Sequence, residues 1–250
     1  MKIILSVILL ILFSLSTIAQ TVRLELPSLS EGETIIEHTG YTLSFDEQTL
    51  CPKWVAWELT AEEVVGVVPR SKDFFPDPLL PVALQVQPTD YRGFGYDRGH
   101  MCPAADMKWS AEAMHECFYM SNMCPQDRTL NGVGWERLES ACRRWAQQEG
   151  SVFIVCGPVY YPDSTVQTIG PMERKIRVPD AFFKVVLSTR TDHEKALGFV
   201  YINDSRKQNM GEVCCSVDEI EKITGYDFFP SLEDGLEKRV ESMNKLSVWK

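Results

Sequence analysis

The chain has 250 residues, a formal net charge of −10 and 44% hydrophobic residues. This length and composition fit one large globular domain with a sizeable core, and they exclude a low-complexity or repeat protein. Because phosphate binding is driven by Lys and Arg, the acidic balance also makes nucleic acid an unobvious partner.

The first 19 residues, MKIILSVILLILFSLSTIA, are typical of a secretory signal, with Lys2, an apolar run and a small-residue end at Thr17 and Ala19. The apolar run is shorter than the ~20 residues of a membrane-spanning helix, which favours cleavage over an uncleaved anchor. We therefore expect residues 1–19 to be a signal peptide and residues 20–250 a single domain. The mature protein is expected to be secreted or periplasmic, without stable membrane association, and its net charge falls to −11 with the loss of Lys2.

The predicted elements begin with alternating segments in residues 20–50, such as TVRLEL and HTGYTLSFD, which indicate strands. CPKWVAWELT, at 51–60, predicts another strand. Residues 66–95 are typical of a loop, with five prolines and a glycine pair at 93 and 95. A loop of this length inside a compact domain is usually functional or flexible.

Helical signals dominate the middle of the chain. Residues 109–122 begin like a helix capped by Ser110, and residues 130–150 carry the clearest helical pattern, with apolar residues at three- and four-residue steps and Gly150 at the end. A buried strand is predicted at 151–161 and a strand pair at 181–189 and 195–203. A capping box predicts a helix at 216–225, and a last helix follows Pro230. This mixed order indicates an α+β fold.

Three polar segments stand out from this framework. DRGH, at 97–100, taken alone is compatible with a surface turn that holds a satisfied histidine. FYMSNMCPQ, at 118–126, places polar residues where a core strand would be apolar. In LNGVGWERLE, at 130–139, Asn131 opens the best helix, either as its cap or as a functional group. Glu139 lies about 12 Å further along an α-helical axis, so the two side chains cannot both ligate one metal directly.

Together, DRGH, SNxxPQ and LNxxxWxxLE resemble the DNA/RNA non-specific endonucleases, most specifically over residues 96–145 and less so from about 51 to 229. The resemblance implies a ββα-metal nuclease fold with a mixed or antiparallel central sheet flanked by helices. It implies metal-dependent hydrolysis of phosphodiester bonds in DNA and RNA with little sequence or sugar selectivity. Mg²⁺ is the implied cofactor, with Mn²⁺ as a substitute, and homodimers are frequent in the family.

The resemblance also implies a role for each matching residue. His100 corresponds to the general base, Asn131 to the direct metal ligand and Glu139 to the acid that orients metal-bound waters. Four further residues would lie near the substrate phosphate: Arg98 and Asn122 as supporting groups, and Arg70 and Arg143 as substrate contacts. The residue types suit the chemistry, because a neutral imidazole can take a proton near neutral pH and Mg²⁺ prefers oxygen ligands.

The eight cysteines leave two interpretations open. In an exported protein they are expected to form disulfides, with Cys142–Cys156 as the first candidate because a helix and its following strand return side by side. Cys102 and Cys124 flank the polar motifs and would then stiffen the site. The alternative is a structural zinc ion held by these two cysteines and His100.

Two other functions compete with that of an endonuclease. One is a nucleic-acid-binding or regulatory module that keeps the fold without catalysis, although the intact His100, Asn131 and Glu139 argue against it. The other is a hydrolase of small phosphodiesters. The acidic net charge leaves room for a nucleic-acid groove, because local basic residues can outweigh the total. The candidates for such a groove, or for an ordinary solvated surface, are Arg137, Arg143, Arg144, Arg174, Lys175 and Arg177.

Overall fold

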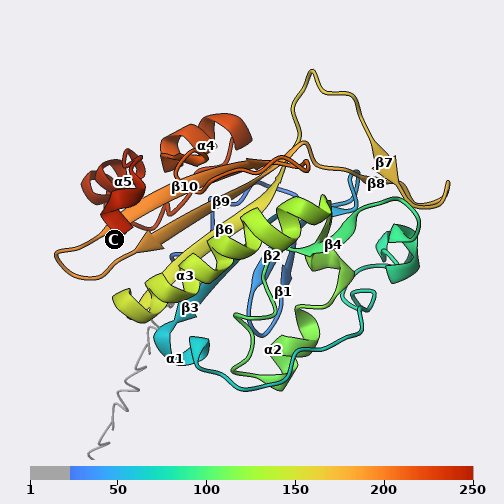
Figure 1. The fold of residues 1–250 in the computed structure, drawn as a ribbon, viewed down its shortest axis with the longest axis horizontal. Coiled ribbons are helices and arrows are strands. Elements are labelled where there is room, and N and C mark those ends of the chain that lie inside the picture. Colours follow the sequence, from blue (N-terminus) through green and yellow to red (C-terminus); the bar gives the residue numbers. More distant parts are fainter. Residues whose placement is uncertain (1–22, 250) are drawn as a thin grey trace, which may run out of the picture.

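The computed structural model describes residues 23–249, so the predicted signal peptide at 1–19 lies outside the described residues. Seven antiparallel strands form the central sheet, in the order β1-β2-β3-β6-β9-β10-β11 (Figure 1). Their bounds are β1 Thr34–Glu37, β2 Thr42–Asp46, β3 Cys51–Thr60, β6 Ser151–Val159, β9 Ala181–Ser188, β10 Lys195–Ile202 and β11 Cys214–Cys215.

The predicted strands at 51–60, 151–161 and the pair 181–189 and 195–203 are confirmed, because apolar and β-branched residues dominate each of them. β9 is buried along its whole length, as expected for a central strand covered on both faces. The prediction for TVRLEL is wrong in the part that the structure describes, since residues 23–26 form a turn and not a strand. Arg23 and Glu25 pair with each other at 2.8 Å, so this alternation reflects local ion pairing.

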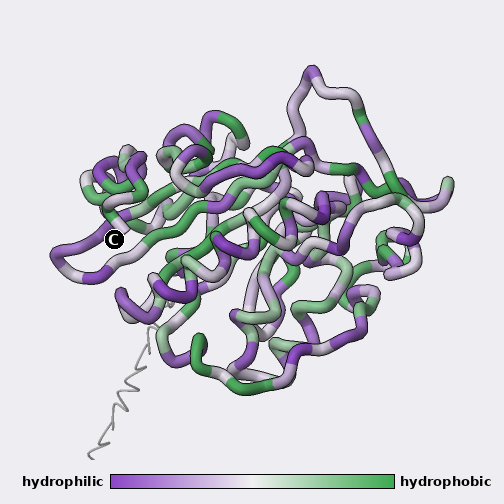
Figure 2. The backbone as a smooth tube through the Cα atoms, viewed as in Figure 1, coloured by the Kyte–Doolittle hydropathy of each residue, from purple (hydrophilic) through white to green (hydrophobic). Residues whose placement is uncertain are grey.

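Helices cover both faces of the sheet, which confirms the α+β prediction (Figure 1). On one face, α4 (Val217–Thr224) and α5 (Asp234–Glu241) pack mainly over β9 and β10 and bury Val217, Ile220 and Val240. Ser216 caps α4 with the predicted capping box, and Gly225 ends it at a φ of 75°. α3 (Glu136–Glu149) packs on the other face. Figure 2 shows hydrophobic residues following the central strands and hydrophilic residues in the outer loops and helix turns.

The chain between β3 and β6 covers the sheet face on which α3 packs. It contains the short helices α1 (Ala61–Val64) and α2 (Ala111–Glu116), with Ser110 capping α2 as predicted. Three 3₁₀ turns, η1 (Val82–Leu84), η2 (Pro88–Tyr91) and η3 (Met120–Asn122), interrupt long loops. The remaining small elements are the strand pair β7 (Thr168–Ile169) and β8 (Ile176–Arg177) and the terminal turn η5 (Leu246–Trp249). Within residues 23–249, no helix has the length and apolar character needed to cross a membrane.

Two predicted polar segments pair with each other. β4 (Asp97–His100) and β5 (Met123–Gln126) form an antiparallel ribbon in which Gly99 faces Cys124. A Cβ atom at Gly99 would collide with the side chain of Gln126, so the ribbon needs glycine there. The DRGH segment is therefore a strand and not a surface turn.

The clearest predicted helix begins in an unexpected conformation. After two α-helical residues, Arg128 and Thr129, residues Leu130–Trp135 form a π-helical turn, η4, and from Glu136 the chain continues as α-helix. Gly132 disfavours a regular α-helical start, and the carboxylate of Asp127 accepts hydrogen bonds from the amides of Thr129 (2.7 Å) and Leu130 (3.2 Å). Such π turns are frequent at functional sites, and this one carries Asn131.

All eight cysteines are free thiols, so the predicted disulfides, including Cys142–Cys156, are wrong. Six of them are buried and pack as small apolar residues in the core, as Cys156 does with its thiol against the carbonyl oxygen of Met101 at 3.3 Å. The alternative zinc site is not formed either, because His100, Cys102 and Cys124 do not gather their ligand atoms in the described part of the chain.

Candidate active site

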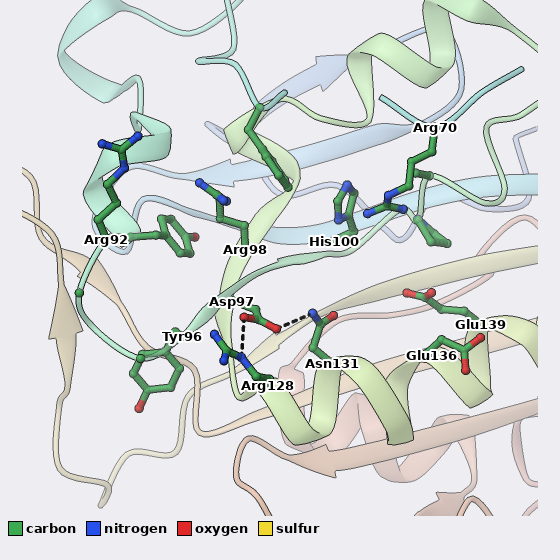
Figure 3. Close-up of a pocket in the computed structure, with 16 residues that line it drawn as sticks. Arg70, Arg92, Tyr96, Asp97, Arg98, His100, Arg128, Asn131, Glu136 and Glu139 are labelled. Carbon is green, nitrogen blue, oxygen red and sulfur yellow. Dashed lines mark hydrogen bonds and ion pairs between the residues drawn. The ribbon is translucent and has the colours of Figure 1, made fainter. Parts of the chain in front are cut away.

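A cleft of about 700 Å³ opens where the β4–β5 ribbon meets the helix that starts at η4 (Figure 3). Its walls come from the long loop after β3, from β4 and from one face of η4 and α3. The lining residues are Arg70, Phe74, Tyr91, Arg92, Gly93, Gly95, Tyr96, Asp97, Arg98, His100, Pro103, Ala104, Arg128, Asn131, Glu136 and Glu139. Five of the seven predicted site residues therefore share one cavity.

His100 lies at the end of β4 and is 8% exposed. Its ring packs edge-on against Phe118 at 4.8 Å, and its carbonyl oxygen accepts a hydrogen bond from the indole of Trp135 at 3.3 Å. Burial and the positive charges of Arg70 and Arg98 lower the pKa of His100 to about 3. The imidazole is therefore neutral near pH 7, and its Nε2 atom has no hydrogen-bond partner within residues 23–249.

Asn131 is held by an acidic neighbour on β4. Its Nδ2 atom donates to Asp97 Oδ2 at 3.1 Å, while Arg128 Nε approaches the other carboxylate oxygen at 3.4 Å (Figure 3). This hydrogen bond fixes which end of the amide is nitrogen, so the carbonyl oxygen remains available to the cleft. Asp97 stands in the DRGH segment, but sequence reasoning assigned it no role.

Glu139 lies on the helix face that lines the cleft, together with Glu136 (Figure 3). Burial raises the pKa of Glu139 to about 7, although the positive charge of Lys184 opposes this rise. Lys184 comes from β9, is 1% exposed, and places its ammonium 4.5 Å from the ring centre of Trp135. A lysine inside the apolar run AFFKVVLS was the sequence signal for this buried charge, and the sequence interpretation missed it.

Four arginines outnumber the three carboxylates that line the cleft, so the cleft is locally basic on an acidic molecule. Arg98 lies over the ring of Phe74 at 4.3 Å and donates to the carbonyl oxygen of Pro88 at 3.1 Å. Arg70 approaches the ring of Phe118 at 5.1 Å. Arg92 and Arg128 also line the cleft and complete the set. Stacked guanidinium groups keep their N–H donors directed at the cleft, which suits recognition of phosphate.

Asn122, predicted as a supporting group near the phosphate, does not line the cleft. Its side chain is fully buried, accepts from the amide of Cys102 at 2.9 Å and donates to the carbonyl oxygens of Cys102 and Cys117 at 2.9 and 2.8 Å. All three of these hydrogen bonds go to the backbone. It holds the segment that follows His100 in place.

Arg143 also lies outside the cleft, so its predicted contact with substrate is corrected. The guanidinium is bound to Asp106 at 2.9 Å and to Ser140 at 2.8 Å. Asp106 is fully buried and also accepts a hydrogen bond from the indole of Trp57 at 3.2 Å. Arg143 thus neutralises a buried carboxylate beneath the site. The other basic candidates at 137, 144, 174, 175 and 177 do not line the cleft.

A ribbon of two strands and a helix that converge on a buried histidine, an amide and carboxylates define the ββα-metal class of protein. The chain belongs to the DNA/RNA non-specific endonuclease family, whose family model matches residues 23–235.

Individual relatives agree with this assignment. The chain is 35% identical over 217 residues to the mouse protein "Nuclease EXOG, mitochondrial", covering 81% of this chain and 58% of the relative. It is 33% identical over 226 residues to a nuclease from Nostoc, covering 86% and 80%. A solved structure of the EndoG/EndoGI complex, described as a mechanism of EndoG inhibition, superposes with a TM-score of 0.77 at 31% identity, covering 83% of this chain and 89% of that chain.

These relatives correct one prediction about location. The mouse relative is named as mitochondrial, as are its human and fission-yeast counterparts, and this overturns the predicted secreted or periplasmic location. An apolar N-terminal run was therefore not a sufficient signal for export. The chain spans about three fifths of the length of the vertebrate relatives that it matches.

Proposed function

We propose that this chain is a divalent-metal-dependent endonuclease that hydrolyses phosphodiester bonds in DNA and RNA. The observation that carries the proposal is the meeting of a neutral His100, the free amide oxygen of Asn131 and four arginines in one cleft. The family assignment and the relatives named as nucleases support the same activity.

The donor set fits a hard divalent cation. Asn131 offers an amide oxygen, and the carboxylates of Glu139 and Glu136 lie on the same lining face. Mg²⁺ prefers such oxygen donors and usually keeps several waters, so we assign Asn131 as direct ligand and Glu139 as the group that orients those waters. Mn²⁺ is a chemically reasonable substitute. A cation bound there would neutralise charge on the phosphate and on the leaving oxygen.

The protein's own groups account for the remaining chemistry. The imidazole of His100 accepts a proton from water as the water oxygen forms its bond to phosphorus, and the bond to the leaving sugar oxygen then breaks. Arg98 and Arg70 hold the negative phosphate oxygens, since a guanidinium donates two parallel hydrogen bonds. Asp97 keeps the amide of Asn131 in the required orientation. Contacts to phosphate alone explain why such a site would have little sequence selectivity.

Activity gels on supercoiled DNA and on RNA, with Mg²⁺ or with EDTA, test this proposal. We expect cleavage of both polymers with Mg²⁺ and none with EDTA. His100→Ala should lower the rate by about 10²–10⁴-fold, the usual contribution of a positioned base. The matched control is His193→Ala, which removes an exposed turn histidine.

Full activity of folded His100→Ala would refute the assigned role of His100. Binding of DNA without cleavage by the wild-type protein would instead support a binding module, and cleavage of small diesters alone would support a small-substrate hydrolase.

A further inference from the structure

Three carboxylates meet where α4 packs beside α5, on the sheet face opposite α3. Asp218 and Glu221 come from α4 and Glu241 from the last residue of α5. One oxygen of each side chain lies within 4.8 Å of the other two. Like charges this close repel strongly unless a proton or a cation lies between them.

Glu241 is the most unusual member of this carboxylate cluster. The residue is 6% exposed, and its Oε1 atom has no hydrogen-bond partner within residues 23–249. By contrast, Glu221 is already stabilised, since one of its oxygens accepts from the amide of Phe228 at 2.9 Å. Burying a carboxylate oxygen without a hydrogen-bond donor costs free energy. A proton or a bound cation would remove this cost.

The charged groups that act most strongly on Glu241 are all negative. Glu237 of α5 and Asp227 of the turn after α4 add to the repulsion by Glu221 and Asp218. Glu241 also ends α5, where the helix dipole is negative and disfavours an anion. Burial and these charges raise the pKa of Glu241 to about 9.

We propose that Asp218, Glu221 and Glu241 bind one Ca²⁺ ion that ties α4 to α5, separate from the metal of the cleft. Oxygens within 4.8 Å of one another are close enough to share one cation. Ca²⁺ accepts carboxylate oxygens at about 2.3–2.6 Å in flexible geometry, whereas Mg²⁺ demands a near-ideal octahedron and usually keeps several waters, so three carboxylates from two helices suit Ca²⁺ better. Ca²⁺ would bind this cluster whether or not the cleft cleaves nucleic acid.

The consequence is structural, because α5 leads into the last segment of the chain. In that segment, the ring of Trp249 lies 4.7 Å from the ring of Trp145 on α3. An ion that fixes α5 would therefore also stabilise the packing of Trp249 against α3 on the other face of the sheet. We expect Ca²⁺ to raise thermal stability without being required for phosphodiester cleavage.

Thermal unfolding of the metal-stripped full chain, with and without CaCl₂, tests the site. At a Ca²⁺ concentration about 100 times the dissociation constant, we expect the melting temperature to rise by about 5 °C or more. Glu241→Gln and Asp218→Asn should abolish this rise. Asn131→Ala, which removes the cleft ligand, and Glu31→Gln, which removes one charge from an exposed turn, should keep it.

Calorimetric titration with CaCl₂ on the same variants gives the stoichiometry. One site that persists in Asn131→Ala and disappears in Asp218→Asn supports the proposal. It is overturned if wild-type protein shows no Ca²⁺ response, or if the response is lost only in Asn131→Ala. Should Glu241→Gln fail to fold, Asp218→Asn decides alone, because Asp218 is only partly buried. DNA cleavage by Asp218→Asn with Mg²⁺ should remain at the wild-type rate.

Discussion

The residues of the cleft are arranged in pairs, in which one group faces the cleft and a neighbour fixes its orientation or its charge state. Asn131 depends on Asp97 for the orientation of its amide. The positive charge of buried Lys184 lowers the pKa of Glu139 and so opposes the effect of burial. His100 is kept neutral by burial and by two neighbouring arginines. The partners are as important as the groups they serve, because orientation and charge state decide whether an amide can bind metal or an imidazole can accept a proton.

Asp97→Ala tests the first of these pairs. Without its acceptor, the amide of Asn131 is free to rotate, so metal affinity should fall. We expect the Mg²⁺ concentration for half-maximal rate to rise by about 10–100-fold, with much of the rate recovered at saturating Mg²⁺. Arg137→Gln is the control, since Arg137 is exposed on α3 and does not line the cleft. Equal Mg²⁺ curves for wild type and Asp97→Ala would contradict the role of Asp97.

The pH dependence of cleavage distinguishes Glu139 from His100. With a pKa of about 7, Glu139 becomes protonated as the pH falls through neutrality, and the rate at low Mg²⁺ should fall there. Higher Mg²⁺ should move this fall to lower pH, because cation and proton compete for the carboxylate. With a pKa of about 3, His100 should contribute no fall between pH 5 and 8.

The pH dependence of cleavage by Lys184→Met tests whether Lys184 controls the pKa of Glu139. Loss of the buried positive charge should raise the pKa of Glu139 further, so the fall in rate should begin at higher pH than in wild type. A merely structural role of Lys184 would lower stability and leave the pH profile unmoved. The profile of kcat/KM against pH at fixed Mg²⁺ distinguishes these outcomes.

At the scale of elements, the sequence predicted the helices and strands whose formation depends mainly on residues that are close in sequence. The strand at 51–60, the buried strands and the capping box at Ser216 were all predictable, because each depends on neighbours in sequence. The motifs at 97–100 and 130–139 predicted the centre of the cleft. The π turn at Asn131 was not predictable, since helical periodicity does not distinguish an α start from a π start.

The misplaced residues share a different cause. Asn122 and Arg143 are polar residues near the motifs, but tertiary packing turns them toward backbone carbonyls and toward Asp106. The cysteines were assigned to disulfides from an expected oxidising compartment and not from geometry. A polar residue type in a motif predicts that it matters, whereas its partners decide whether it touches substrate or supports the fold.

Substitutions at Gly132 and Gly134, the two glycines of the π turn, should have opposite effects on stability. A Cβ at Gly132 would meet open space, so Gly132→Ala should stabilise the helix by about 0.5–1 kcal/mol. A Cβ at Gly134 would lie 3.1 Å from the ring of Tyr201 and 3.3 Å from Leu130, so Gly134→Ala should lower the melting temperature. Thermal unfolding of both variants checks the pair, and a similar shift in both would refute the packing argument.

At the scale of the whole molecule, charge is separated between the two faces of the sheet. The cleft gathers four arginines, whereas α4 and α5 carry the carboxylate cluster on the other face. The net charge of −10 therefore describes the body of the protein and not the surface that a polyanion would meet. Such a distribution would orient an approaching nucleic acid toward the cleft and repel it elsewhere.

The dependence of binding on salt tests this separation of charge. Each arginine that contacts a phosphate releases counterions, so affinity should fall steeply as salt rises. Arg92→Gln removes one exposed cation from the cleft rim, and we expect it to weaken binding uniformly across sequences and to reduce the slope of log Kd against log salt by about 1. Lys238→Gln removes the same charge from exposed α5 and should leave the slope unchanged. The measurement uses fluorescently labelled single-stranded DNA with Ca²⁺ in place of Mg²⁺. Equal slopes for Arg92→Gln and Lys238→Gln would show that the net charge, and not the cleft, governs the encounter.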